Sequence, residues 1–210
     1  MLATYNWTVS SSTRLLLVRH GRTDPQWQSD TKLCGWYDPP LGLAGQEDAG
    51  RAASKLRAGG PYSVLYTSPL RRAQESANVI AAELGLSIVS VADLGEIRCG
   101  VLDGEPFRVI QEEHPEIWEK NLAQCDEGFR WPGGESYSEF RKRVDGGLSA
   151  IAESHVRTNV IIVTHYGVIA QAIGTLEGIS PARWDIARPA HGSVTEIRWG
   201  SGGPESAMFW

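Results

Sequence analysis

The sequence contains little cysteine, and its three cysteines are not arranged for metal binding or cross-linking. Cys34, Cys99 and Cys125 lie far apart, with no Cys-x-x-Cys pair and no histidine at the spacing of zinc ligands. This spacing argues against both a structural zinc site and a disulfide framework. A reducing compartment is the better expectation for such a chain, so we predict a cytoplasmic protein.

Long apolar runs and an excess of basic residues are also missing. No segment has the apolar length needed to span a bilayer, and residues 1–13 have neither the basic start nor the apolar stretch of a signal peptide. The formal net charge is -5 at pH 7. Because binding to a nucleic-acid backbone relies on clustered positive charge, we expect neither a nucleic-acid nor a membrane partner.

What remains is the composition of an ordinary globular chain. Its 210 residues, 41% hydrophobic and 21% charged, can bury a substantial core, and we expect one domain over 1–210. Strands are expected at 15–18, 62–67, 87–91, 160–163 and 193–199, and helices over 43–57, 70–84, 109–124, 137–154 and 168–176. This alternation predicts an α/β fold, a three-layer αβα sandwich with a mostly parallel sheet. Residues 93–134 would be an insertion of loops and short helices over the sheet's carboxyl edge.

Two of the predicted strands end in a histidine. The apolar run 15–18 is followed by Arg19 and His20, and the run 160–163 is followed one residue later by His165. Either histidine alone would more often be a polar residue bonded to the backbone. Ligand sites of open α/β sheets lie outside the carboxyl ends of the strands, however, so both histidines should meet at one site. Two imidazoles and a guanidinium there indicate a phosphate ester as the substrate.

Two more positive charges fall at the start of a predicted helix. We interpret Ser68 and Pro69 as its N-cap and first residue, which places Arg71 and Arg72 in the first turn. A helix N-terminus favours anions. Both arginines lie off the apolar face, so helical periodicity does not choose between them, and two solvated side chains would fit equally well.

Five ordered motifs include these residues, and through them the chain resembles the histidine phosphatase superfamily. That group includes the cofactor-dependent phosphoglycerate mutases and many small-molecule phosphatases. The motifs are R-H-G-x-T at Arg19, His20, Gly21 and Thr23, with Arg22 where Glu is commonest; S-x-L-x-R-A at Ser68 to Ala73; L-x-E-x-x-x-G-x-x-x-G at Leu94 to Gly104; P-G-G-E-S at Pro132 to Ser136; and V-[ST]-H at Val163 to His165. The resemblance covers nearly the whole chain and is specific because the motifs occur together and in order.

The resemblance implies a role for each matched residue. His20 would attack phosphorus and form a phosphohistidine, while Arg19, Arg72 and His165 would surround the phosphoryl oxygens. The motif thus selects Arg72 over Arg71. For His20 to attack through Nε2, its Nδ1 should donate its proton to a nearby backbone carbonyl. No cofactor is implied, and no metal is expected because the guanidinium groups supply the positive charge.

Glu96 is the residue that the resemblance implies as general acid and base. It would protonate the leaving oxygen and then deprotonate the water that hydrolyses phosphohistidine. Asp103, Glu105 and Glu135 lie in the same region of the sequence. Proximity therefore does not single out Glu96, and the assignment depends on the motif.

The loop after the first predicted strand looks like the mutase segments W-N and R-F-T-G-W-Y-D, with two extra residues. By this likeness Thr23, Gln28, Cys34 and Gly35 would bind phosphate or substrate. Gln28 stands where relatives have Asn, and Cys34 where they have Thr. Tyr166 occupies a place where a smaller residue is usual, so it would narrow the pocket or hydrogen-bond the substrate.

Beyond Glu96 the likeness to mutases fades. The paired arginines expected in their insertion are replaced here by Trp118-Glu119-Lys120-Asn121, and the insertion is acidic. A mutase must hold a second anionic group and keep water from phosphohistidine, and such an insertion suits neither task. We therefore predict a phosphomonoesterase acting on a small phosphorylated metabolite.

Two alternatives stay open, a phosphoglycerate-type mutase and a catalytically idle binding protein of the same fold. The sequence also leaves open the identity of the ester and the oligomeric state, a homodimer included. Aromatic residues of the insertion either stack on a sugar or apolar body or belong to the core. They are Phe107, Trp118, Phe129 and Trp131.

Overall fold

A single six-stranded sheet organises the protein, whose computed structural model describes residues 12–123, 126–179 and 187–210. The strands are β1 (Thr13–Arg19), β2 (Val64–Thr67), β3 (Ile88–Ser90), β4 (Asn159–Thr164), β5 (Val194–Gly200) and β6 (Gly203–Phe209). Their order across the sheet is β3-β2-β4-β1-β5-β6. The first four pair in parallel, β5 pairs antiparallel with β1, and β6 antiparallel with β5. The expected mostly parallel sheet is confirmed.

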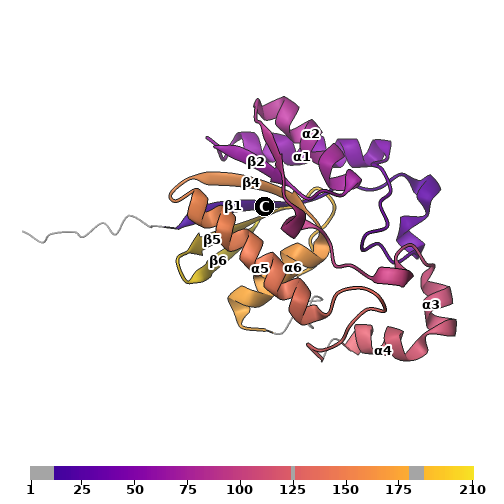
Figure 1. Ribbon diagram of the computed structural model, residues 1–210. Helices are drawn as coiled ribbons and strands as arrows, with labels where there is room; N and C mark the ends of the chain where they lie inside the picture. Colours follow the sequence, from indigo (N-terminus) through magenta and orange to yellow (C-terminus); the bar gives the residue numbers. More distant parts are fainter. Residues whose placement is uncertain (1–11, 124–125, 180–186) are drawn as a thin grey trace, which may run out of the picture.

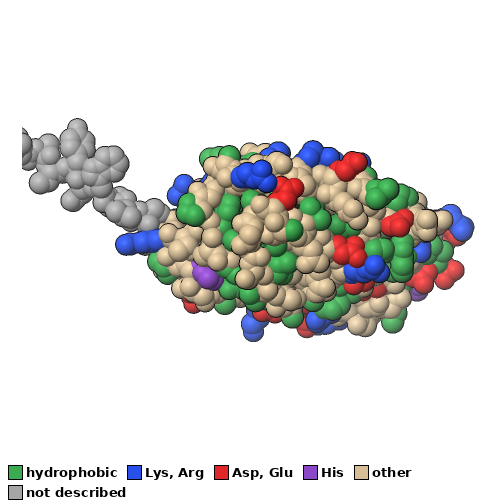
Figure 2. All heavy atoms as spheres, turned by 90° about the horizontal axis from the view of Figure 1, so that it is seen from above, with side chains coloured by type: hydrophobic (Ala, Val, Ile, Leu, Met, Phe, Trp, Pro, Cys, Tyr) green, Lys and Arg blue, Asp and Glu red, His purple; other side chains and the backbone are tan. Residues whose placement is uncertain are grey.

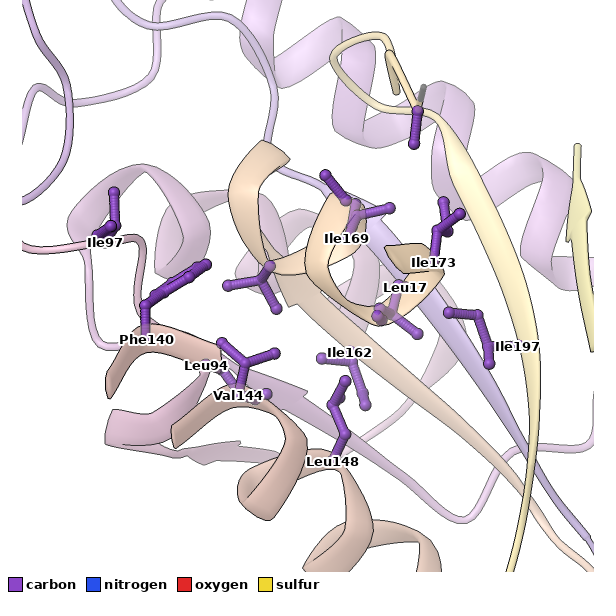
Figure 3. Close-up of a cluster of buried hydrophobic side chains, with 14 of the residues drawn as sticks. Leu17, Leu94, Ile97, Phe140, Val144, Leu148, Ile162, Ile169, Ile173 and Ile197 are labelled. Carbon is purple, nitrogen blue, oxygen red and sulfur yellow. The ribbon is translucent and has the colours of Figure 1, made fainter. Parts of the chain in front are cut away.

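Helices cover both faces of this sheet (Figure 1). Helices α1 (Leu43–Arg57) and α2 (Arg71–Leu84) lie on one face, and α5 (Tyr137–Ser154) and α6 (Tyr166–Glu177) on the other. Side chains alternate between the two faces of a strand. Accordingly Leu16 and Val18 pack among the side chains of α1 and α2, whereas Leu15 and Leu17 pack with those of α5 and α6. Figure 3 shows Leu17 among Val144 and Leu148 of α5 and Ile169 and Ile173 of α6. The three-layer αβα sandwich is therefore confirmed.

The insertion consists of short helices that pack against the loop after β1. Its elements are η3 (Ala92–Leu94), η4 (Gly100–Leu102), α3 (Phe107–Glu113) and α4 (Pro115–Ala123), and the loop after β1 contains η1 (Pro25–Trp27) and η2 (Ser29–Thr31). Leu33 N–H donates to the Glu105 carbonyl at 2.9 Å, and Gly104 N–H donates to the Leu33 carbonyl at 2.9 Å. Phe129 and Trp131 are buried in the core, and the rings of Phe107 and Trp118 pack on each other.

Several boundaries differ from the predicted ones. Helix α2 begins at Arg71 with Leu70 as its N-cap and not at Pro69 with Ser68, whose hydroxyl instead accepts from Leu70 N–H at 3.2 Å before the helix starts. Residues 203–209, beyond the last predicted strand, form β6, which is held by backbone pairing with β5. At the other end Thr13 already belongs to β1, and residues 1–11 lie outside the described residues. The predicted helix end at 124, and Cys125, lie outside them too.

The surface carries both signs of charge. Figure 2 shows the face above α1 and α2, where basic and acidic side chains are interspersed among apolar ones. Within 12–123, 126–179 and 187–210, no helix is both long enough and apolar enough to cross a membrane. Helix α5 begins with a capping box, in which Ser136 and Glu139 bond to each other's backbone N–H groups.

Candidate active site

The carboxyl ends of β1 and β4 bring the two predicted histidines together. Arg19 and Thr164 are register partners in the two strands, and His20 N–H donates to the Thr164 carbonyl at 2.9 Å. The rings of His20 and His165 consequently lie with their centroids 5.1 Å apart. Both side chains are buried. Two strand ends separated by about 145 residues thus form one site, as expected from their apolar runs.

The surroundings of His20 determine which of its nitrogens carries the proton. Its Nδ1 lies 2.8 Å from the Gly21 carbonyl oxygen, and a carbonyl can only accept, so Nδ1 is the donor. The predicted bond to a backbone carbonyl is therefore present. Burial lowers the pKa of His20 well below its ordinary value, and the charges of Arg72 and Arg19 lower it further. His20 is neutral at pH 7, with its lone pair on Nε2.

Arg72 is fixed beside His20 by backbone oxygens of the loop after β1. Its Nη1 donates to the Tyr37 carbonyl at 2.8 Å, and its Nη2 to the carbonyls of Gly35 at 2.9 Å and Cys34 at 3.3 Å. Its Nε points at His20 Nε2 at 3.3 Å. Arg71, by contrast, is exposed and forms a surface ion pair. The structure thus places Arg72, and not Arg71, at the site.

Arg19 and His165 each have one buried nitrogen without a hydrogen-bond partner in the described part of the chain. Arg19 Nη1 donates to the Pro189 carbonyl at 2.9 Å, and its guanidinium lies 5.4 Å from the centre of the Tyr166 ring. His165 Nε2 lies 2.7 Å from the Ser68 hydroxyl. Among the described residues, Arg19 Nε and His165 Nδ1 are buried without a hydrogen-bond partner. Buried polar atoms are normally paired, so Arg19 Nε, on a residue that lines the cavity described below, is available to bind a ligand.

Glu96 contributes a buried carboxyl group to the same place. Its Oε1 accepts from Ile97 N–H and its Oε2 from Gly167 N–H, both at 2.9 Å. Burial raises the pKa of Glu96, while these two hydrogen bonds and the charges of Arg72 and Arg19 oppose the rise. Gly167 is required here because a Cβ at this position would lie 2.2 Å from Glu96 Oε1.

The other carboxylates of the region are used elsewhere. Asp103 accepts from Trp36 N–H at 2.7 Å and from Cys99 N–H at 3.0 Å, which fixes the loop after β1 on the insertion. Glu135 is paired with Arg143 at 2.7 Å. Neither of these two, nor Glu105, lines the cavity in which Glu96 lies. Geometry therefore separates Glu96 from the three candidates that sequence proximity left equal.

These groups surround a cavity of about 210 Å³, which we call the histidine cavity. Its lining residues are Arg19, His20, Thr23, Ser29, Asp30, Cys34, Arg72, Glu96, Tyr166 and His191. His165, whose ring centroid lies 5.1 Å from that of His20, is not itself part of the lining. Burial raises the pKa of the Cys34 thiol to about 11, so at pH 7 this group is an uncharged thiol.

Two residues predicted to bind substrate do not reach the histidine cavity. Gln28 is exposed and adopts a left-handed backbone (φ 51°) between η1 and η2, so Ser29 and Asp30 take the place expected for it. Gly35 is buried and contributes through its carbonyl, which accepts from Arg72. Thr23 does line the cavity, and its hydroxyl is hydrogen-bonded to that of Ser29.

His191 is a cavity residue that the sequence did not reveal. Its ring centroid lies 5.4 Å from that of His20. Burial and then the Arg19 charge lower the pKa of His191 to about 4, so it is neutral at pH 7. The antiparallel pairing of β5 with β1 would have located it, since Val194 is the register partner of Val18. Residues just before β5 must then lie beside the carboxyl end of β1.

The site combines a neutral imidazole, two guanidinium groups and a buried carboxyl group. This set can offer a lone pair to an electrophile, neutralise an anion and transfer a proton. Within the described residues, no three His, Cys, Asp or Glu side chains converge as a set of metal ligands would. Arg19 and Arg72 are the cationic side chains among the described residues that line the cavity.

Comparison with known proteins places the chain among relatives of the same size. "Probable phosphoglycerate mutase GpmB" of Yersinia enterocolitica is 32% identical over 168 residues, which are 80% of this chain and 76% of that one. The crystal structure of the α-ribazole phosphatase of Shigella flexneri is 25% identical with a TM-score of 0.76, covering 94% of both chains. Bacillus stearothermophilus YhfR is 26% identical with a TM-score of 0.83, covering 92% of this chain and 94% of that one.

The family is shown by a match over almost the entire described sheet and all four flanking helices. The matching family model extends over residues 15–209 and is that of the histidine phosphatase superfamily, branch 1. It includes both histidines, both cavity arginines and Glu96. The chain belongs to the histidine phosphatase superfamily.

Proposed function

We propose that the protein is a phosphomonoesterase that hydrolyses a small phosphorylated metabolite through a phosphohistidine on His20. The observation that carries this proposal is the state of His20. Its Nδ1 proton is bound to the Gly21 carbonyl, which leaves the Nε2 lone pair at the cavity beside Arg72. A neutral imidazole next to guanidinium groups suits attack on a phosphate ester, whose oxygens the guanidiniums neutralise.

The first step transfers the phosphoryl group to His20. The lone pair of Nε2 forms the N–P bond as the bond between phosphorus and the leaving oxygen breaks. Arg72 Nε, which faces Nε2 in the free protein, and the unpartnered Arg19 Nε bind phosphoryl oxygens. Glu96, whose pKa is raised by burial, donates its proton to the leaving oxygen.

The second step returns the enzyme to its starting state. The Glu96 carboxylate takes a proton from water, whose oxygen bonds to phosphorus as the N–P bond breaks. The electron pair of that bond returns to Nε2, and phosphate leaves. Because His20 keeps its Nδ1 proton on the Gly21 carbonyl throughout, one tautomer serves both steps.

A mutase remains the second candidate because the Yersinia relative carries that name. Mutase activity requires a second anionic group to be held while phosphohistidine waits. Apart from the residues assigned to the phosphoryl group, Asp30 is the charged side chain that lines the histidine cavity. None of the described lining residues comes from α3 or α4. A carboxylate repels a second anion, so the lining favours hydrolysis.

The test is a phosphate-release screen over metabolite monoesters, with 3-phosphoglycerate included. Free phosphate is the expected product, whereas appearance of 2-phosphoglycerate without phosphate would establish a mutase. His20→Ala should abolish release, and His114→Ala, an exposed histidine away from the cavity, is the matched control. Retained hydrolysis in His20→Ala would exclude the covalent route. A ³²P label that the wild-type protein takes up from a labelled ester and keeps in alkali, as phosphohistidine does, would support it.

A further inference from the structure

A second cavity adjoins the histidine cavity. It has a volume of about 660 Å³ and is lined by 22–26 of the loop after β1, by 42–44 at the start of α1, and by Asp30 and His191. Thr23, Asp30 and His191 line both cavities and so form the boundary between them. The rest of each wall is separate, since the second cavity contains nothing from α2, α6 or the insertion.

The two cavities differ in volume and can therefore hold different parts of a ligand. Pockets for small organic ligands usually enclose about 300–1,000 Å³, a range that includes the second cavity and exceeds the histidine cavity. The histidine cavity therefore holds the phosphoryl group with little room for more. A larger ester must extend beyond it, and the second cavity, which shares three lining residues with it, is the adjoining space.

The charges of the second cavity disfavour an anion. Among the described residues of its lining, Arg22 is the only cationic side chain, and its guanidinium is already paired with Asp48, at 2.8 Å and 2.9 Å. His191 is neutral at pH 7, as its lowered pKa shows. The remaining charges of the lining are the two carboxylates of Asp24 and Asp30 and roughly half a positive elementary charge from the N-terminus of α1. The net charge of the second cavity is therefore negative.

An apolar side chain stands at the rim. Leu43 is the first residue of α1 and is 82% exposed, although it lines the second cavity together with Pro25 and Ala44. Its surface would be removed from water by a ligand in the cavity. An apolar portion of the ligand would gain most from this contact.

We propose that the second cavity holds the organic body of the ester, and that this body is uncharged or cationic and partly apolar. The inference rests on the proposed phosphatase function and specifies its substrate class. A body that carries a carboxylate, such as that of phosphoglycerate, would meet Asp30 at the boundary. The substrates should therefore be monoesters of neutral or basic alcohols larger than glycerol.

Two matched comparisons test the role of the Asp30 charge and the role of the apolar contact with Leu43. Glycerol 3-phosphate and 3-phosphoglycerate differ only in a hydroxymethyl group against a carboxylate. The wild type should have the higher kcat/KM for glycerol 3-phosphate, and Asp30→Asn should reduce that preference about fivefold. For the contact, Leu43→Ala should lower kcat/KM for 2-naphthyl phosphate about fivefold and leave methyl phosphate unchanged.

Leu122→Ala is the matched control, because Leu122 is an exposed leucine of α4 that lines neither cavity. An unchanged ester preference in Asp30→Asn, or an equal effect of Leu43→Ala on both aryl and methyl esters, would overturn the assignment of the second cavity. Both results require an active enzyme. Absence of phosphate release from every ester would instead refute the proposed function, and this inference with it.

Discussion

Adding one methyl group at Gly167 should displace the Glu96 carboxyl group without removing it. A Cβ on Gly167 would lie 2.2 Å from Oε1, 3.0 Å from the carboxyl carbon and 3.3 Å from Oε2 of Glu96. Real Cβ contacts stay beyond 3.0 Å, so Oε1 must move by about 0.8 Å, and the bond from Gly167 N–H is strained with it. A catalytic group misplaced by about 1 Å can cost roughly 100-fold in rate.

The effect should depend on the leaving group. Gly167→Ala is expected to lower kcat about 100-fold for phenyl phosphate, whose leaving phenoxide needs a proton, and less than tenfold for 4-nitrophenyl phosphate, whose leaving group is more acidic. Steady-state assays of both esters measure the ratio. Gly146→Ala is the control, because Gly146 is exposed in α5, its Cβ would meet nothing within 4 Å, and the substitution should stabilise the protein by about 1 kcal/mol.

An equal loss of rate with both esters would refute the reasoning, since it would mean that the substitution perturbs phosphate binding and not proton transfer. Unchanged rates would refute it as well. Thermal unfolding of the variant separates either result from a loss of fold.

Three further predictions concern charge and protonation. Glu96→Gln should slow phenyl phosphate far more than 4-nitrophenyl phosphate, and equal slowing would contradict its role as an acid. EDTA should leave kcat unchanged, because arginines supply the positive charge; a loss restored by a divalent cation would contradict this. Burial lowers the pKa of His20, His165 and His191 in the folded state, so the unfolded state binds more protons below about pH 6.5. The free energy of unfolding should therefore fall as the pH drops from 6.5 towards 5, by up to about 1.4 kcal/mol per pH unit for each histidine, and urea titrations at both pH values would show no such fall if these groups were charged when folded.

The parts of the site that the sequence revealed are those attached to regular elements. Buried parallel strands have near-continuous apolar runs, so the positions of His20 and His165 at strand ends could be predicted from the pattern alone. Helical periodicity could not separate Arg71 from Arg72, because both lie off the apolar face. The choice required the motif, and the structure agrees with it through the loop carbonyls that fix Arg72.

The parts that were missed depend on irregular backbone or on backbone pairing. Gln28 was expected at the phosphate, but its left-handed conformation turns the chain so that Asp30 lines the cavity. His191 lies in a loop without periodicity, and only the pairing of β5 with β1 locates it. Likewise β6 is an edge strand whose side chains are mostly exposed, so its composition resembles that of a tail.

The anchoring of Arg72 by main-chain oxygens has a consequence for how this site tolerates change. Its guanidinium contacts the carbonyls of Cys34, Gly35 and Tyr37, and every amino acid carries that same carbonyl. The side chain at Cys34, which lines the histidine cavity, can therefore be exchanged while the guanidinium of Arg72 stays where it is. Main-chain atoms of this loop thus hold the positive charge in place, and side-chain atoms of the same loop line the histidine cavity.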